Sequence, residues 1–152
     1  MLSPSVPLAL VLVPLAVVLR LTCNLLDGAL ARRTGRVHAR GELYNELGDR
    51  SADVLMLVPV AFVPGAIAPL VWAGVVLALL ASLTAVATKA AGGSRTYRGI
   101  LSKPGRMALL TVFSIAVLLV GPDAWWPFGP LLAIGAALTL GERVLVGLRE
   151  LP

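Results

Sequence analysis

The side chains that could carry chemistry gather between Asn24 and Asp53. This stretch holds three of the chain's four aspartates, two of its four glutamates and its only histidine, His38. The acids are Asp27, Glu42, Glu46, Asp49 and Asp53. The flanking sequence is made almost entirely of leucine, valine, alanine and isoleucine. Because charged side chains next to apolar segments are costly to place, this concentration of acids predicts a functional site.

Helical spacing would arrange these polar residues as two stripes, because positions i, i+3, i+4 and i+7 of a helix share one face. The first stripe consists of Arg20, Asn24, Asp27, Gly28 and Ala31. The second consists of Gly41, Asn45, Asp49 and Asp53, with Glu46 beside it. Two antiparallel helices that present these stripes to each other would bring several carboxylates and two amides into a small volume.

Such a cluster must share protons or cations, since like charges about 4 Å apart repel by roughly 4 kcal/mol at an effective dielectric near 20. Carboxylate and amide oxygens favour Mg²⁺, Ca²⁺ or Mn²⁺, and Mg²⁺ usually completes its shell with substrate phosphates. Metal ions held this way stabilise the entering and leaving oxygens of a phosphoryl transfer. The two stripes therefore predict a divalent-metal site among these acids and amides. Interhelical hydrogen bonds are the alternative for the two asparagines, and a solvated helix start is the alternative for Glu46.

The composition indicates a membrane protein. Of the 152 residues, 58% are hydrophobic and 14% are charged, whereas soluble domains average about 45–50% apolar and about 25% charged residues. The net charge of +5 is not gathered in a basic patch with interleaved aromatics, so we expect no nucleic-acid partner. A single cysteine, Cys23, excludes an internal disulfide.

The apolar segments predict an all-α integral membrane fold of about five transmembrane helices, each of roughly 20 residues, in a single domain over residues 1–152. The expected helices cover residues 5–31, 41–63, 70–88, 107–120 and 131–146. Residues 64–69 and 121–130 are expected turns, and Trp125, Trp126 and Phe128 suit an aromatic belt at headgroup level.

Charge asymmetry orients these segments. The connector 32–40 carries four arginines, and the stretch 89–106 carries three arginines and two lysines, both without an acid. Basic loops lie on the cytoplasmic side, so the predicted site faces the cytoplasm. Five crossings then place the amino terminus outside, and we expect that a helix precedes Met1. The basic stretch would suit a second anionic ligand, and topology determination is the alternative role of Arg95, Arg98, Lys103 and Arg106.

The first two segments resemble the CDP-alcohol phosphotransferases, integral membrane enzymes of phospholipid synthesis. The family signature is Asp-x2-Asp-Gly-x2-Ala-Arg-x8-Gly-x3-Asp-x3-Asp. In this chain the eight positions, in order and with every gap kept, are Asn24, Asp27, Gly28, Ala31, Arg32, Gly41, Asn45 and Asp49. Six of the eight match, and asparagine replaces aspartate at positions 24 and 45. Members of the family usually have six transmembrane helices, so this chain resembles one that lacks the first.

The resemblance implies a reaction and a role for each position. A phosphatidyl group would pass from a CDP-linked lipid such as CDP-diacylglycerol to an alcohol, with release of CMP. Asp27 would bind Mg²⁺ or Mn²⁺, with Asn24 and Asn45 at the places of metal-binding aspartates. Asp49, or Asp53 one turn further on, would be the catalytic base. The full set of implied metal ligands is Asn24, Asp27, Asn45, Asp49 and Asp53. The cytidine diphosphate would lie among Gly28, Ala31, Arg32 and Gly41. Arg95, Arg98, Lys103 and Arg106 would contact the acceptor or its phosphate.

Several features have a second interpretation. Arg20 would either pair with an acid of the cluster or bind phosphate, and His38 is a titrating bystander in a basic loop. The chain could also keep the fold without catalysis and bind a nucleotide-lipid or a partner protein. The expected partners are a CDP-linked lipid, a small alcohol, membrane lipids and a second copy of the chain in a homodimer. The expected location is a bacterial cytoplasmic membrane.

Overall fold

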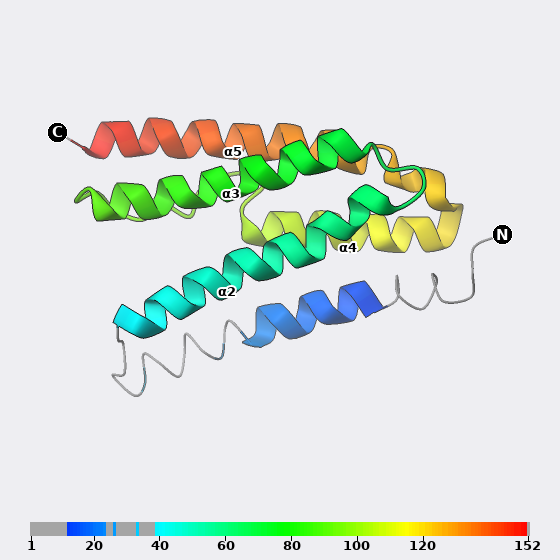
Figure 1. Cartoon of the computed structure of the whole chain (residues 1–152), viewed down its shortest axis with the longest axis horizontal. Helices are drawn as coiled ribbons and strands as arrows, with labels where there is room; N and C mark the ends of the chain where they lie inside the picture. Colours follow the sequence, from blue (N-terminus) through cyan, green and yellow to red (C-terminus); the bar gives the residue numbers. More distant parts are fainter. Residues whose placement is uncertain (1–11, 24–25, 27–32, 34–38, 152) are drawn as a thin grey trace.

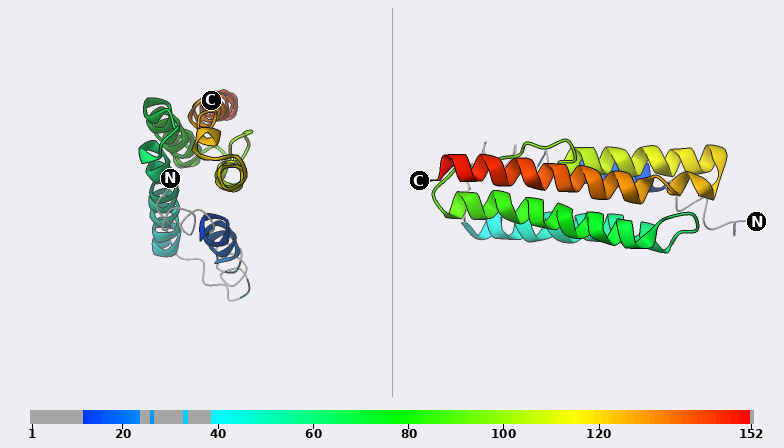
Figure 2. Two further views of the ribbon diagram at one scale, coloured as in Figure 1. Left: turned by 90° about the vertical axis from the view of Figure 1, so that its right-hand side faces the viewer. Right: turned by 90° about the horizontal axis from the view of Figure 1, so that it is seen from above.

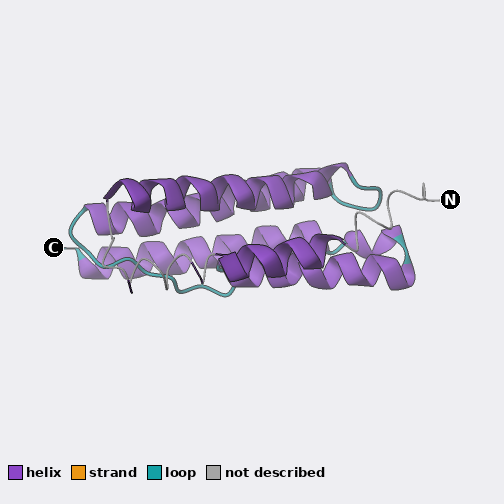
Figure 3. Cartoon of the chain, turned by 90° about the horizontal axis from the view of Figure 1, so that it is seen from below, coloured by secondary structure: helices purple, strands orange, loops and turns teal. Residues whose placement is uncertain are grey.

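The computed structural model describes residues 12–23, 26, 33 and 39–151. Within these ranges the protein is all-helical, as predicted (Figures 1 and 3). Its elements, after the apolar helix Leu12–Cys23, are α2 (Ala39–Leu57), η1 (Val58–Phe62), α3 (Ala68–Ala90), α4 (Lys103–Val120), η2 (Pro122–Trp125) and α5 (Phe128–Glu150). The helices lie side by side along the long axis of the molecule (Figure 2).

Proline and glycine set most of the helix boundaries. Pro59 lacks an N–H and its ring crowds the carbonyl four residues earlier, so the α-helix ends at Leu57 and continues as a 3₁₀ turn. The expected helix over residues 41–63 is therefore two elements. Pro69 and Pro104 lie in the first turns of α3 and α4. Gly92, with φ of 97°, follows the last turn of α3, and its left-handed conformation favours glycine there.

Three of the helices are long and apolar enough to span a membrane. They are Ala68–Ala90, Lys103–Val120 and the segment Pro122–Glu150, with mean hydropathies of 2.3, 1.6 and 1.7. The described part of the first expected crossing, Leu12–Cys23, is apolar but shorter. Helix α2, which corresponds to the first part of the expected second crossing, is polar over its first turns. These spans show an integral membrane protein.

Helices α3 and α5 pack against each other through small residues. A Cβ added at Gly74 would lie 2.6 Å from Leu132 Cγ and 3.0 Å from the backbone nitrogen of Ala133. A Cβ added at Gly147 would lie 2.6 Å from Thr88 Oγ1. Lipid supplies no hydrophobic driving force between helices, so close approach of backbones through small residues is a main source of their association.

Aromatic residues fill the end of the core where the turn at residues 63–67 meets η2. Trp125 and Phe128 are buried, with ring centroids 5.3 Å apart, and Phe113 packs against both. The prediction that Trp125 and Phe128 belong to an interfacial belt is therefore wrong. Trp125 in η2 and Phe128 at the start of α5 both pack into the core, whereas Trp126 between them is exposed.

We predict that Gly74→Ala destabilises the α3–α5 pair. The new methyl group must displace Leu132 or separate the backbones, and overpacking of this kind costs about 1–3 kcal/mol. Gly141→Ala is the matched control, because no described atom lies within 4 Å of a Cβ placed there. Alanine in that helix should raise stability slightly. Thermal unfolding in detergent, followed by circular dichroism, measures both, and an unchanged melting temperature for Gly74→Ala would contradict the packing described.

Candidate functional site

Four acids on one face of α2 bind basic residues of the segment 89–106, which we call the basic connector. Following the chain, the pairs are Glu42 with Lys89, Glu46 with Arg95, Asp49 with Lys103 at 2.5 Å, and Asp53 with Arg106 at 2.6 Å. Because these acids recur at helical spacing, the basic connector can follow α2 over a rise of about 16 Å. We call this arrangement the ion-pair ladder.

The ladder becomes more buried along α2. The exposed fraction of the acidic side chain falls from 48% at Glu42 to 5% at Asp53. The hydrogen bond and the charge of Lys89 hold the pKa of Glu42 below its usual value. Exposed pairs of this kind contribute little to stability because water and salt screen them. Loss of one partner of a buried pair is costly, because the other charge is then left uncompensated.

Asp53 links three helices at the inner end of the ladder. Its Oδ1 accepts a hydrogen bond from Arg20 at 2.5 Å, and its Oδ2 accepts one from Arg106 at 2.6 Å. Arg20 also donates to the backbone oxygen of Asp49 at 3.0 Å. Of the two roles considered for Arg20, the structure shows pairing with an acid. Both oxygens of Asp53 are occupied by guanidinium groups, so this geometry favours Asp49 over Asp53 as a base and a metal ligand.

Asp49 lies between two cavities. One, of about 370 Å³, lies beside the Leu12–Cys23 helix and α2, and its lining includes Arg20, Cys23, Asn45 and Asp49. We call it the motif cavity, because Cys23 immediately precedes the first motif position. The other, of about 270 Å³, is lined by Asp49 together with residues of α2, α3, α4, α5 and the basic connector. We call it the basic cavity.

The basic cavity gathers cations from three parts of the chain, α2, the basic connector and α5. Among the described residues its cationic lining consists of Arg50, Arg95, Lys103, Arg106 and Arg143. Three of the four predicted acceptor contacts are thus brought together. The fourth, Arg98, has an exposed side chain, and its carbonyl oxygen accepts a hydrogen bond from Arg143 Nε at 2.9 Å.

Sequence reasoning missed Arg50 and Arg143 as members of this cavity. Arg143 is buried in α5 and also donates to the carbonyl oxygen of Ala81 in α3 at 2.9 Å. It therefore holds the basic connector against two helices. The available signal was an arginine next to Glu142 within a mainly apolar terminal segment, since a charged side chain is costly in a membrane unless it has partners.

The motif cavity offers donors of the type that Mg²⁺ prefers. Asn45 and Asp49 are four residues apart on α2, so a carboxylate and an amide oxygen share one face. Within the described residues, no three His, Cys, Asp or Glu side chains form a cluster that could hold a metal ion. The described donors fit the ion in chemical type. Of the other predicted ligands, Asp53 has both oxygens bound by arginines, and Asn24 and Asp27 lie outside the described residues.

Of the other motif positions, some lie outside the described residues and one, Gly41, lies within them. Gly28, Ala31, Arg32 and the bystander His38 also lie outside the described residues. Gly41 is exposed at the start of α2, and no described atom lies within 4 Å of a Cβ added there. Packing within the described structure therefore does not require a glycine at position 41, which is compatible with its predicted place beside a ligand.

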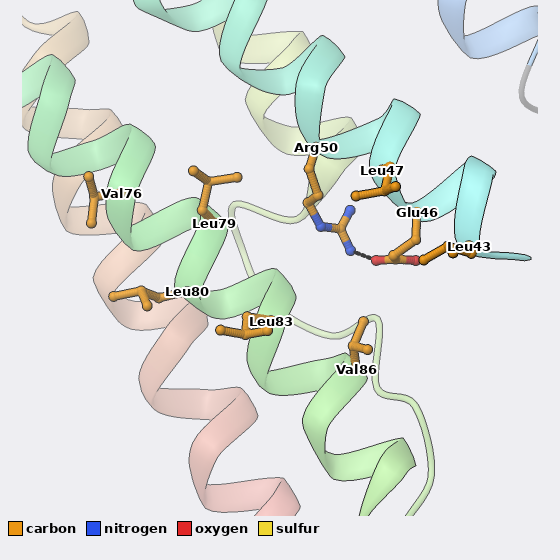
Figure 4. A pocket seen from close by; sticks show the side chains of 9 residues that line it. All are labelled: Leu43, Glu46, Leu47, Arg50, Val76, Leu79, Leu80, Leu83 and Val86. Carbon is orange, nitrogen blue, oxygen red and sulfur yellow. Dashed lines mark hydrogen bonds and ion pairs between the residues drawn. The ribbon is translucent and has the colours of Figure 1, made fainter.

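An apolar groove of about 460 Å³ lies between α2 and α3, and Arg50 is one of the residues that line it (Figure 4). Leucine and valine side chains form most of its lining, including Leu43, Leu47, Leu80 and Leu83. Arg50 and Glu46 bind each other at its edge. Because Glu46 also binds Arg95, this glutamate belongs to the ladder, and its role is not that of a solvated helix start.

The chain is 26% identical over 145 residues to the inner membrane protein YnbA of Escherichia coli (strain K12), which covers 92% of this chain and 72% of the relative. No family model and no solved structure matches the chain. The relative's name agrees with the membrane-spanning helices described above and states no activity.

We predict that Asp53→Asn lowers the stability of the folded protein. Arg20 and Arg106 would lose their shared anion, and breaking a buried ion pair costs about 3–5 kcal/mol. Glu142→Gln, at an exposed acid of α5, is the control for the loss of one carboxylate. The melting temperature in detergent should fall clearly for Asp53→Asn and little for Glu142→Gln. Equal melting temperatures would show that Asp53 does not hold these helices together.

Proposed function

We propose that this protein is a membrane phosphotransferase of the CDP-alcohol phosphatidyltransferase type, acting in phospholipid biosynthesis. It would move a phosphatidyl group from a CDP-linked lipid, such as CDP-diacylglycerol, to an alcohol and release CMP. The observation that carries the proposal is the position of Asp49, which lines both the motif cavity and the basic cavity. A base that serves a transfer between two ligands must reach both.

The motif spacing supports the same reaction. Eight positions from Asn24 to Asp49 keep every gap of the family signature. The described part of this motif, from Gly41 to Asp49, lies on α2 with Asn45 and Asp49 on the motif cavity. We therefore assign the motif cavity to the cytidine diphosphate end of the donor, on the cytoplasmic side of a bacterial inner membrane.

The proposed step is an in-line displacement. The acceptor hydroxyl gives its proton to an Asp49 carboxylate oxygen, and the hydroxyl oxygen forms a bond to the phosphorus that carries the lipid alcohol. The bond from that phosphorus to the bridging oxygen breaks, and CMP leaves with both electrons of that bond. Lys103 holds Asp49 Oδ1 at 2.5 Å, which fixes the carboxylate between the two cavities. Mg²⁺ or Mn²⁺, bound by Asp49, Asn45 and the predicted ligands Asn24 and Asp27, would neutralise the diphosphate.

One observation favours a second candidate function. Asparagine occupies two positions, 24 and 45, where the family signature has aspartate, and each replacement removes a full negative charge from the predicted metal site. A protein of the same fold that binds a nucleotide-lipid without turnover would tolerate this loss. The two candidates differ in whether CDP-diacylglycerol is consumed.

We predict metal-dependent release of CMP when purified protein receives CDP-diacylglycerol, Mg²⁺ or Mn²⁺ and a panel of alcohols. Asp49→Asn should lower turnover by about 10²–10⁴-fold, the range contributed by a positioned general base, without loss of folded protein. Asp123→Asn, at an exposed acid on the opposite end of the bundle, is the control and should retain activity.

Chromatographic measurement of CMP decides between the candidates. Binding of CDP-diacylglycerol without CMP release across the whole panel would favour the non-catalytic protein. Absence of both binding and release would refute the proposed function.

A further inference from the structure

The apolar groove between α2 and α3 is not used by the proposed reaction. Leu47 of α2 and Leu83 of α3 are among the side chains that form its walls (Figure 4). Leu47 is two residues away from both Asn45 and Asp49, and two residues correspond to about 200° around a helix. The groove therefore lies on the face of α2 opposite the motif cavity, and a ligand bound in it leaves the proposed donor site free.

The groove has the length of one membrane leaflet. Its α3 wall runs from Val76 to Val86 within the span Ala68–Ala90, which is a rise of about 15 Å. The hydrocarbon core of a bilayer is about 30 Å thick, so one leaflet contributes about 15 Å. Beyond Val76 the two helices close, because Leu57 of α2 and Val75 of α3 are both buried in the core. A spanning helix between α2 and α3 would need a groove along the whole span, whereas an acyl chain needs only this half.

Basic side chains gather where the groove opens toward the basic connector. A smaller cavity of about 180 Å³ continues the groove there, since Leu43, Glu46 and Val86 line both. Lys89 and Arg95 also line this smaller cavity. An apolar channel within the membrane thus leads to a polar rim at one end, which is the pattern of a phospholipid with its acyl chain and headgroup.

The charge of this rim is mainly positive. Arg40 is exposed and precedes Leu43 by three residues, so it lies on the same face of α2. The described cations at this end of the groove are Arg40, Arg50, Lys89 and Arg95, and the acids beside them are Glu42 and Glu46. Lys89 is half exposed, and its ammonium group has three donors. It can therefore bind Glu42 and a phosphate oxygen at the same time.

We propose that the groove binds an anionic phospholipid from the leaflet that meets the basic connector. One acyl chain lies between α2 and α3, and the phosphodiester headgroup lies at Arg40 and Lys89. Each Lys or Arg near an anionic lipid surface strengthens binding by a factor of about five. The site therefore selects a lipid with a net negative headgroup, such as phosphatidylglycerol, over a zwitterionic one. Because Glu46 lines the groove and binds Arg95, the bound lipid contacts the exposed end of the ion-pair ladder.

Lipid selectivity is measured on the full chain purified in detergent. The protein is titrated with phosphatidylglycerol or phosphatidylcholine of identical acyl chains in mixed micelles, and native mass spectrometry counts the lipids retained per chain. We expect one retained phosphatidylglycerol, preferred over phosphatidylcholine by about fivefold or more. The preference should fall as added salt screens the charges. Equal retention of the two lipids would overturn the proposal.

Two pairs of variants separate the groove from general lipid contact. Leu83→Trp fills the groove and should abolish retention, whereas Leu138→Trp, at an exposed position of α5 outside the cavities described above, should not. Lys89→Gln should weaken retention of phosphatidylglycerol by about fivefold. Arg149→Gln removes the same charge from the exposed last turn of α5 and should leave retention unchanged. Equal effects within either pair would contradict the assignment.

A second copy of the chain is the competing occupant of the groove. Light scattering of the wild type and of Leu83→Trp in detergent distinguishes it from a lipid. A change from dimer to monomer in Leu83→Trp, with retention of phosphatidylglycerol unchanged, would assign the groove to a dimer interface and refute the lipid site. Loss of the retained lipid with the oligomeric state unchanged would support the lipid site.

Discussion

The ion-pair ladder between α2 and the basic connector is the constraint on which the site depends. Helix α2 brings Glu46, Asp49 and Asp53 into a bundle whose other helices are mainly apolar, and buried carboxylates need compensation. Cations from a segment some fifty residues further along the chain supply it. This pairing draws the start of α4 alongside the middle of α2, so the connector lies on the bundle and carries its charges to the cavity.

Asp49 and Asp53 have the same helical spacing but different surroundings in the ladder. Asp53 has both oxygens bound by arginines, and it joins the Leu12–Cys23 helix to α2 and α4. Asp49 binds one lysine and lines two cavities. The first arrangement suits a residue that holds helices together, and the second suits a residue that exchanges a proton with a ligand. Burial and partners, not residue type, make this distinction.

The positive charge of the basic cavity follows from the same arrangement. The acids of α2 neutralise part of the connector, and Arg50 of α2 and Arg143 of α5 add cations from the side. Arg143 also binds the carbonyl oxygens of Arg98 and Ala81, which fastens the connector between α3 and α5.

The sequence by itself determined the fold class, because long apolar runs in a membrane must satisfy their backbone groups as helices. It also determined most helix ends, through residues such as Pro69 and Gly92, and the spacing that places Asn45 and Asp49 on one face. Only the tertiary structure decided which acid meets which base. Helical periodicity places Asp49 and Asp53 on one face of α2, but it does not predict that Arg20, Lys103 and Arg106 approach them from other helices. Nor does local pattern reveal that Trp125 is buried or that Arg143 lines the basic cavity, because both depend on how α3, α4 and α5 pack together.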